Sequence, residues 1–135
     1  GFKDALNRAN ALADVFLAEF KAGRTGLEIV ESAMKKAETE GLRPLIYSHP
    51  LGFHGHAGGC TMDARPAGSA PEGMLDRMAY PLHLDTAYAI EFSSTTAIPE
   101  WGGQDVRIAY EETALFTGEG CRFANGRQEK LLLIK

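Results

Sequence analysis

The architecture of the chain follows from residues 84–116, which read LDTAYAIEFSSTTAIPEWGGQDVRIAYEETALF. Up to about residue 96 the side chains alternate as in a half-buried β-strand. A proline and two glycines within 99–103 mark a turn. Residues 106–116 then read as a second strand, the expected antiparallel partner of the first. One face of the first strand is apolar and carries Tyr88, Ile90 and Phe92.

Two amphipathic helices are expected before this hairpin. Apolar side chains recur at helical spacing between residues 6 and 20, and Gly23 is a plausible helix end. Thr25 is the expected cap of a second helix over residues 26–40. Near Pro44 the period changes from helical to alternating. This order predicts an α+β fold, with two packed helices on one face of a curved, mainly antiparallel sheet.

Shorter segments complete the expected sheet. Residues 45–47 read as a strand before the hairpin. After it, residues 121–123, an Asn125-Gly126 turn and residues 131–134 predict a final hairpin. No repeat or low-complexity linker interrupts the pattern, so residues 1–135 are expected to form one unit.

Composition narrows the classes of function. The 135 residues are 44% hydrophobic and 24% charged, which is ordinary for a globular protein. A net charge of -4 argues against nucleic acid or an acidic membrane as a partner, and no apolar run is long enough to span a membrane. Cys60 and Cys121 lack the spacing of a zinc site, which leaves either a disulfide or two semi-buried thiols.

Residues 48–82 are expected to be a long irregular segment, rich in Gly, Pro and Ala. Such a long loop in a compact domain is usually functional or disordered. It holds His49, His54 and His56 within eight residues, among glycines. Imidazole is a common ligand of divalent transition metals, although incidental histidines in a Gly-rich loop would look the same. His83 stands apart from this group, where a surface or core-edge role is expected.

Two glutamates complete the candidate residues. Glu91 lies among apolar strand residues, where a carboxylate is costly unless it is paired or binds a cation. Strand alternation puts Glu111 on the same face as Arg107 and turns Glu112 to the other face. Taken singly, each glutamate also fits the solvent face of an amphipathic strand.

The order of these segments resembles the pita-bread metallopeptidases, the family of aminopeptidase P, prolidase and methionine aminopeptidase. His49-Pro50-Leu51-Gly52 is similar to the family's His-x-x-Gly motif, and a further histidine follows seven residues after the first. Ile90-Glu91 is similar to the next motif, and counting back from Thr117 puts the last ligand at Glu111 rather than Glu112. Residues 21–25, KAGRT, are similar to the family segment between two helices.

The resemblance implies a function and roles for these residues. It implies metal-dependent peptide hydrolysis of the Xaa-Pro aminopeptidase or dipeptidase type, with two divalent ions (Mn, Co, Fe or Zn) and a homodimer. The metal ligands would be His49, Glu91 and Glu111. His56, or else His54, would act on the substrate, and Arg107 would bind a substrate carboxylate.

The chain also departs from the family pattern. His56-Ala57-Gly58-Gly59 offers a second His-x-x-Gly register, but position 63 is then Asp. Phe92 stands where the family has Pro after the first Glu, and Arg107 lies two residues further from its Glu than the family arginine. The two family aspartates that precede the histidine loop have no counterpart here.

The missing aspartates leave more than one interpretation of the chain. We expect it to be the C-terminal part of a longer enzyme, inactive by itself and with no metal bound or only weak binding. The alternative is a non-catalytic pita-bread domain that binds peptides or a partner protein. Because the chain begins at Gly1, its N-terminus does not indicate location, and the cytoplasm is preferred to the periplasm.

Overall fold

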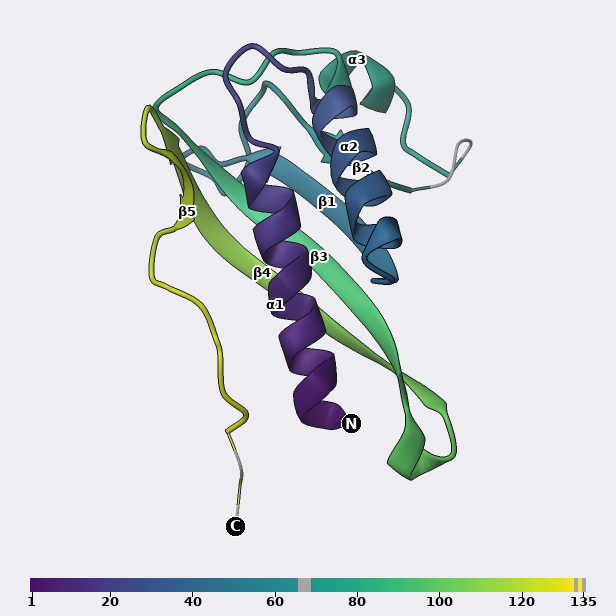
Figure 1. Cartoon of the computed structure of the whole chain (residues 1–135). Coiled ribbons are helices and arrows are strands. Elements are labelled where there is room, and N and C mark those ends of the chain that lie inside the picture. Colours follow the sequence, from purple (N-terminus) through teal and green to yellow (C-terminus); the bar gives the residue numbers. More distant parts are fainter. Residues whose placement is uncertain (66–68, 133, 135) are drawn as a thin grey trace.

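The protein has an α+β fold, as predicted, built from three α-helices and one five-stranded antiparallel sheet within the described residues (Figure 1). The computed structural model describes residues 1–65, 69–132 and 134. The elements in chain order are α1 (Phe2–Ala18), α2 (Gly26–Thr39), β1 (Pro44–Pro50), β2 (Met62–Asp63), α3 (Met74–Met78), β3 (Thr86–Ile98), the 3-10 helix η1 (Pro99–Trp101), β4 (Gln104–Thr117) and β5 (Gly120–Phe123).

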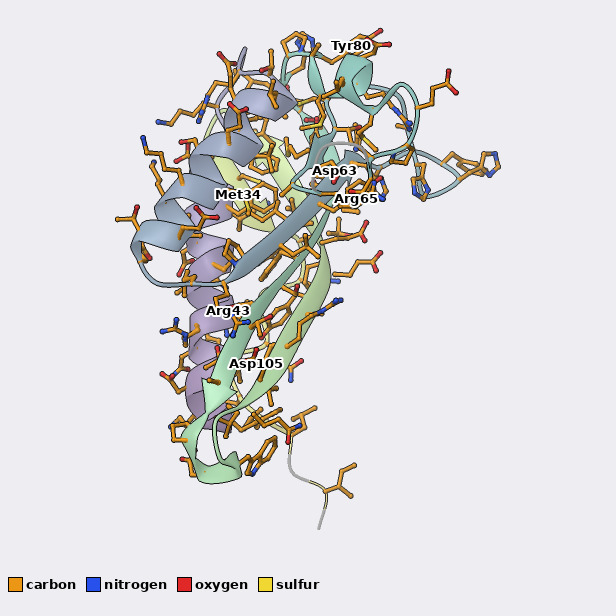
Figure 2. All side chains as sticks on the ribbon, turned by 90° about the vertical axis from the view of Figure 1, so that its right-hand side faces the viewer. Met34, Arg43, Asp63, Arg65, Tyr80 and Asp105 are labelled. Carbon is orange, nitrogen blue, oxygen red and sulfur yellow. The ribbon has the colours of Figure 1, made fainter. Side chains whose placement is uncertain are left out.

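The long β3–β4 hairpin forms the centre of the sheet. The strand order is β2-β1-β3-β4-β5, and every neighbouring pair is antiparallel. The register of the hairpin runs from Thr86 opposite Phe116 to Ile98 opposite Gln104. Helices α1 and α2 lie on the same face of the sheet, and no described helix covers the opposite face (Figures 1 and 2). We call this opposite face the open face.

The core lies between the two helices and the sheet. Phe20 follows α1 and packs edge-on against Tyr88 of β3 and Phe116 of β4, with ring centroids 5.5 and 6.1 Å apart. Ile46 of β1 and Ile90 of β3 are fully buried in the same cluster. Since alternate strand residues point to opposite faces, this packing directs the remaining residues of each strand to the open face.

The turn between the helices is fixed by polar contacts. The side chain of Thr25 accepts a hydrogen bond from the Glu28 amide, and the Glu28 carboxylate accepts one from the Thr25 amide, which forms a capping box. The Glu19 carboxylate lies just after α1, is only 3% exposed, and pairs with Arg24 and Lys36. Through Lys36, this carboxylate ties the end of α1 to the last turn of α2.

Two differences from the sequence-based expectations are informative. The predicted final hairpin is wrong for the described residues: 131, 132 and 134 form no strand, and Leu133 lies outside them. The stretch interpreted as irregular contains β2 and α3, which are too short for a periodic pattern.

Cys60 and Cys121 are both free thiols. No described helix is long and apolar enough to cross a membrane.

We predict that replacing Glu19→Gln makes the free energy of unfolding less dependent on acid pH. Burial opposes ionisation of Glu19, but hydrogen bonds from Lys36 and Arg24 prevail and lower its pKa from 4.5 to about 2. This stabilisation, roughly 3 kcal/mol, is present above pH 4.5 and is lost as the pH falls towards 2. Urea denaturation between pH 7 and pH 2 measures it. Glu38→Gln, at an exposed glutamate of α2, is the control and should keep the wild-type pH dependence.

Candidate functional site

A row of polar side chains crosses four strands on the open face. Glu91 of β3 lies directly opposite Glu111 of β4. On the other side Glu91 lies opposite Tyr47 of β1, which in turn lies opposite Asp63 of β2. Glu91 and Glu111 therefore share one face, where the sequence had predicted them to converge.

His49 joins this row from the end of β1, two residues beyond Tyr47 on the same face. It is 6% exposed, and its Nε2 lies 3.3 Å from Oε1 of Glu91. Its Nδ1 lies 3.0 Å from the carbonyl oxygen of Pro50, which can only accept a hydrogen bond. The proton of a neutral His49 ring is therefore on Nδ1, and the lone pair of Nε2 faces the carboxylate. That contact is repulsive unless a proton or a cation lies between the two atoms.

The pKa of Glu91 reflects its position beside His49 and Glu111. Its side chain is 32% exposed. Burial raises the pKa of Glu91 above its ordinary value, and the negative charge of Glu111 raises it further. The nearby rings of His49 and His56 act in the opposite direction but do not cancel the shift. The pair of carboxylates is thus a place where an added positive charge would be favourable.

The histidine loop is closed at its base by a hydrogen bond from the Ala57 amide to the Pro50 carbonyl, 3.0 Å long. This closure places the ring of His56 parallel to that of His49, with centroids 4.0 Å apart and planes 7° apart. His54 is exposed and packs edge-on against Phe53, which is itself 98% exposed. The loop therefore brings His56, rather than His54, against His49.

Sequence reasoning missed one part of this row. The Arg65 guanidinium binds both carboxylate oxygens of buried Asp63 (Figure 2). It also lies 5.6 Å from the centre of the Tyr47 ring. Burial, followed by the charges of Glu91 and Asp63, raises the pKa of Tyr47 and keeps its hydroxyl protonated. Strand alternation from His49 could have found Tyr47. Asp63 and Arg65 gave no signal, because β2 is only two residues long.

A shallow groove extends from the two glutamates along the hairpin on the open face. Its lining includes Glu91 and Glu111 at one end and Arg107 at the other. Between them lie Ser93 and Ala109, which are directly opposite each other in the β3–β4 register. Arg107 is exposed and forms no ion pair with any described residue. The groove thus has an acidic end, a floor of small side chains and a basic end.

His49, Glu91 and Glu111 are ligand types that suit a divalent cation, but their side chains do not surround one common point. One imidazole nitrogen and two carboxylates are typical ligands for Mn, Co, Fe or Zn. Among residues 1–65, 69–132 and 134, no three His, Cys, Asp or Glu side chains form a ready metal-ligating group. Two like charges on neighbouring strands repel, so separation of the carboxylates is expected without a cation.

Comparison of the chain with family profiles, with curated proteins and with solved structures finds no match in any of the three. The geometry of the open face and the motifs of the sequence are therefore the features that indicate a function.

We predict that Gly52→Ala disturbs the stacked pair of histidines, whereas Gly58→Ala does not. A Cβ on Gly52 would lie 2.7 Å from the carbonyl oxygen of His56, so the backbone that carries His56 must move. A Cβ on Gly58 meets nothing within 4 Å. The ring resonances of His49 and His56 in NMR spectra report the change. Equal spectra for the two variants would contradict this account of the loop.

Proposed function

We propose that this chain carries part of the metal site of a pita-bread metallopeptidase that hydrolyses peptides of the Xaa-Pro type. The observation that carries the proposal is the contact of His49 Nε2 with Glu91 Oε1 at 3.3 Å, with Glu111 directly across the hairpin on the same face. The order of the motifs in the sequence supports the same function.

His49, Glu91 and Glu111 would hold the metal in this proposal. The hydrogen bond from His49 Nδ1 to the Pro50 carbonyl fixes the tautomer whose Nε2 can bind a cation, a common arrangement for metal-binding histidines. A divalent ion at this place supplies Lewis acidity to a peptide carbonyl and acidifies water near neutral pH. Its positive charge would stabilise the carboxylates of Glu91 and Glu111.

The remaining roles belong to residues around the ligands. His56, which stacks on His49, would donate a hydrogen bond to the carbonyl oxygen of the substrate as negative charge develops there. Arg107, at the basic end of the groove, would bind a carboxylate of the substrate. His54, at the exposed tip of the loop, is the weaker candidate for the first role.

We further propose that the chain alone binds metal weakly and hydrolyses peptides negligibly. The family resemblance implies two additional aspartate ligands, which would come from outside these 135 residues. Without them a second ion would lack most of its ligands. The complete enzyme, a homodimer in this proposal, would hold two ions.

The alternative proposal is a non-catalytic domain that binds peptides. It is favoured by one observation: the groove on the open face has an acidic end and a basic end that can contact a peptide without a metal. The two proposals differ in what they require of Glu111, since only the enzyme needs it as a metal ligand.

We predict weak binding of one Mn²⁺ or Co²⁺ ion, with the affinity reduced about tenfold or more by His49→Ala, Glu91→Gln or Glu111→Gln. Titration calorimetry measures the affinity, and an assay with Xaa-Pro dipeptides measures turnover. The control is Glu112→Gln, because Glu112 lies on the opposite face, across from Ile90. A metal affinity that none of the three substitutions changes would disprove the assignment. Tight binding of two ions, or measurable turnover, would show that this chain forms the whole site.

We predict that acidification weakens Mn²⁺ binding, and that this begins at a higher pH than expected for a glutamate ligand with an ordinary pKa. Protons and the cation compete for Glu91, and burial together with the charge of Glu111 raises its pKa above 4.5. Affinity should be full above this raised pKa and should decrease as the pH falls through it. Calorimetry over a pH series measures the dependence. Glu91→Gln should remove the part of the pH dependence that comes from protonation of Glu91. An unchanged pH profile of Mn²⁺ affinity in that variant would contradict the role of Glu91.

A further inference from the structure

The groove on the open face is built from successive cross-strand pairs of the β3–β4 hairpin. Glu91 lies opposite Glu111, Ser93 opposite Ala109, and Thr95 opposite Arg107. Each step along the strands moves two residues and stays on the same face. The acidic and basic ends of the groove are therefore separated by four residues of strand, about 13 Å.

The middle of the groove is open because its floor has small side chains. Ser93 is 4% exposed and Ala109 carries only a methyl group. Leu45 and Tyr47 of β1 line one side of the groove. This apolar and aromatic wall can pack against the side chains of a ligand, while the floor leaves room for its backbone.

Two of the charged groups at the ends, Arg107 and Glu111, lack an opposite partner among the described residues, whereas Glu91 contacts His49. Arg107 forms no ion pair among the described residues, and Glu111 has none either. Four residues of strand, about 13 Å along the backbone, separate Arg107 from Glu111, and no ion pair joins the two side chains. A ligand that is positive at one end and negative at the other, with that spacing, would satisfy both.

We propose that the groove binds short unblocked peptides and selects them by length. The α-carboxylate contacts Arg107, and the amino end lies at Glu91 and Glu111. An extended chain rises about 3.3 Å per residue, so about four residues match the distance between the two ends, whereas a dipeptide covers only half of it. The inference depends on the proposed function in taking the ligand to be a peptide, but it requires neither bound metal nor turnover.

The test is titration calorimetry of the chain with dialanine, tetraalanine, tetraalanine amide and N-acetyl-tetraalanine, in EDTA. Tetraalanine should bind at least about tenfold more tightly than dialanine, and blocking either end should cost a similar factor, because one charge-assisted contact is lost. Arg107→Gln should abolish the difference between tetraalanine and its amide. Arg122→Gln is the matched control: this arginine is also exposed, lies opposite Leu115 on the open face, and does not line the groove.

Three results would overturn the inference: equal affinity for the dipeptide and the tetrapeptide, an Arg107→Gln variant that still distinguishes the amide, or no binding of any peptide to the wild-type chain. Metal binding is measured separately with Mn²⁺. If the chain selects peptides by length in EDTA but does not bind Mn²⁺ in the separate titration, the groove assignment stands and the metal site is contradicted. If the chain binds Mn²⁺ but does not select peptides by length, only the groove assignment is contradicted.

Discussion

The register of the β3–β4 hairpin is the constraint on which the candidate site depends. Because residues alternate between faces, pairing Glu91 with Glu111 decides at once which side chains meet the helices and which stay on the open face. A shift of one residue would turn Glu111 into the core and Glu112 towards the groove. The buried contacts of Tyr88 and Phe116 with Phe20 oppose such a shift. Packing on the helical face thus fixes the chemistry of the open face.

Strong periodic patterns made much of this arrangement predictable from sequence. The hairpin and both long helices extend over enough residues for alternation and helical spacing to be clear. Thr25 caps the second helix as predicted, and the structure adds Glu28 as its partner in a capping box. The common face of Glu91 and Glu111 was expected from the order of the motifs, and the hairpin register puts the two residues opposite each other. The α+β class is therefore confirmed, whereas the pita-bread assignment stays a prediction.

Other features depend on contacts that no local pattern encodes. The two residues of β2 pair with β1 only because the chain returns after the histidine loop, so Asp63 and Arg65 could not be placed beside Tyr47 in advance. The stacking of His56, rather than His54, on His49 depends on the closure between Pro50 and Ala57. Conversely, residues 131–134 have the composition of a strand, but those of them that are described find no partner strand in the sheet.

The open face contrasts with the buried ion pair on the helical side. Glu19 is surrounded by Arg24 and Lys36, so its charge is satisfied within the chain and contributes to the stability of the fold. Glu91 is also partly buried, but its nearest charged neighbour across the hairpin is Glu111, and the folded chain pays for this with a raised pKa. A carboxylate left in an unfavourable environment is typical of functional sites, since the missing positive charge can come from a ligand. For this reason we propose that the function of the chain is located at Glu91 and Glu111.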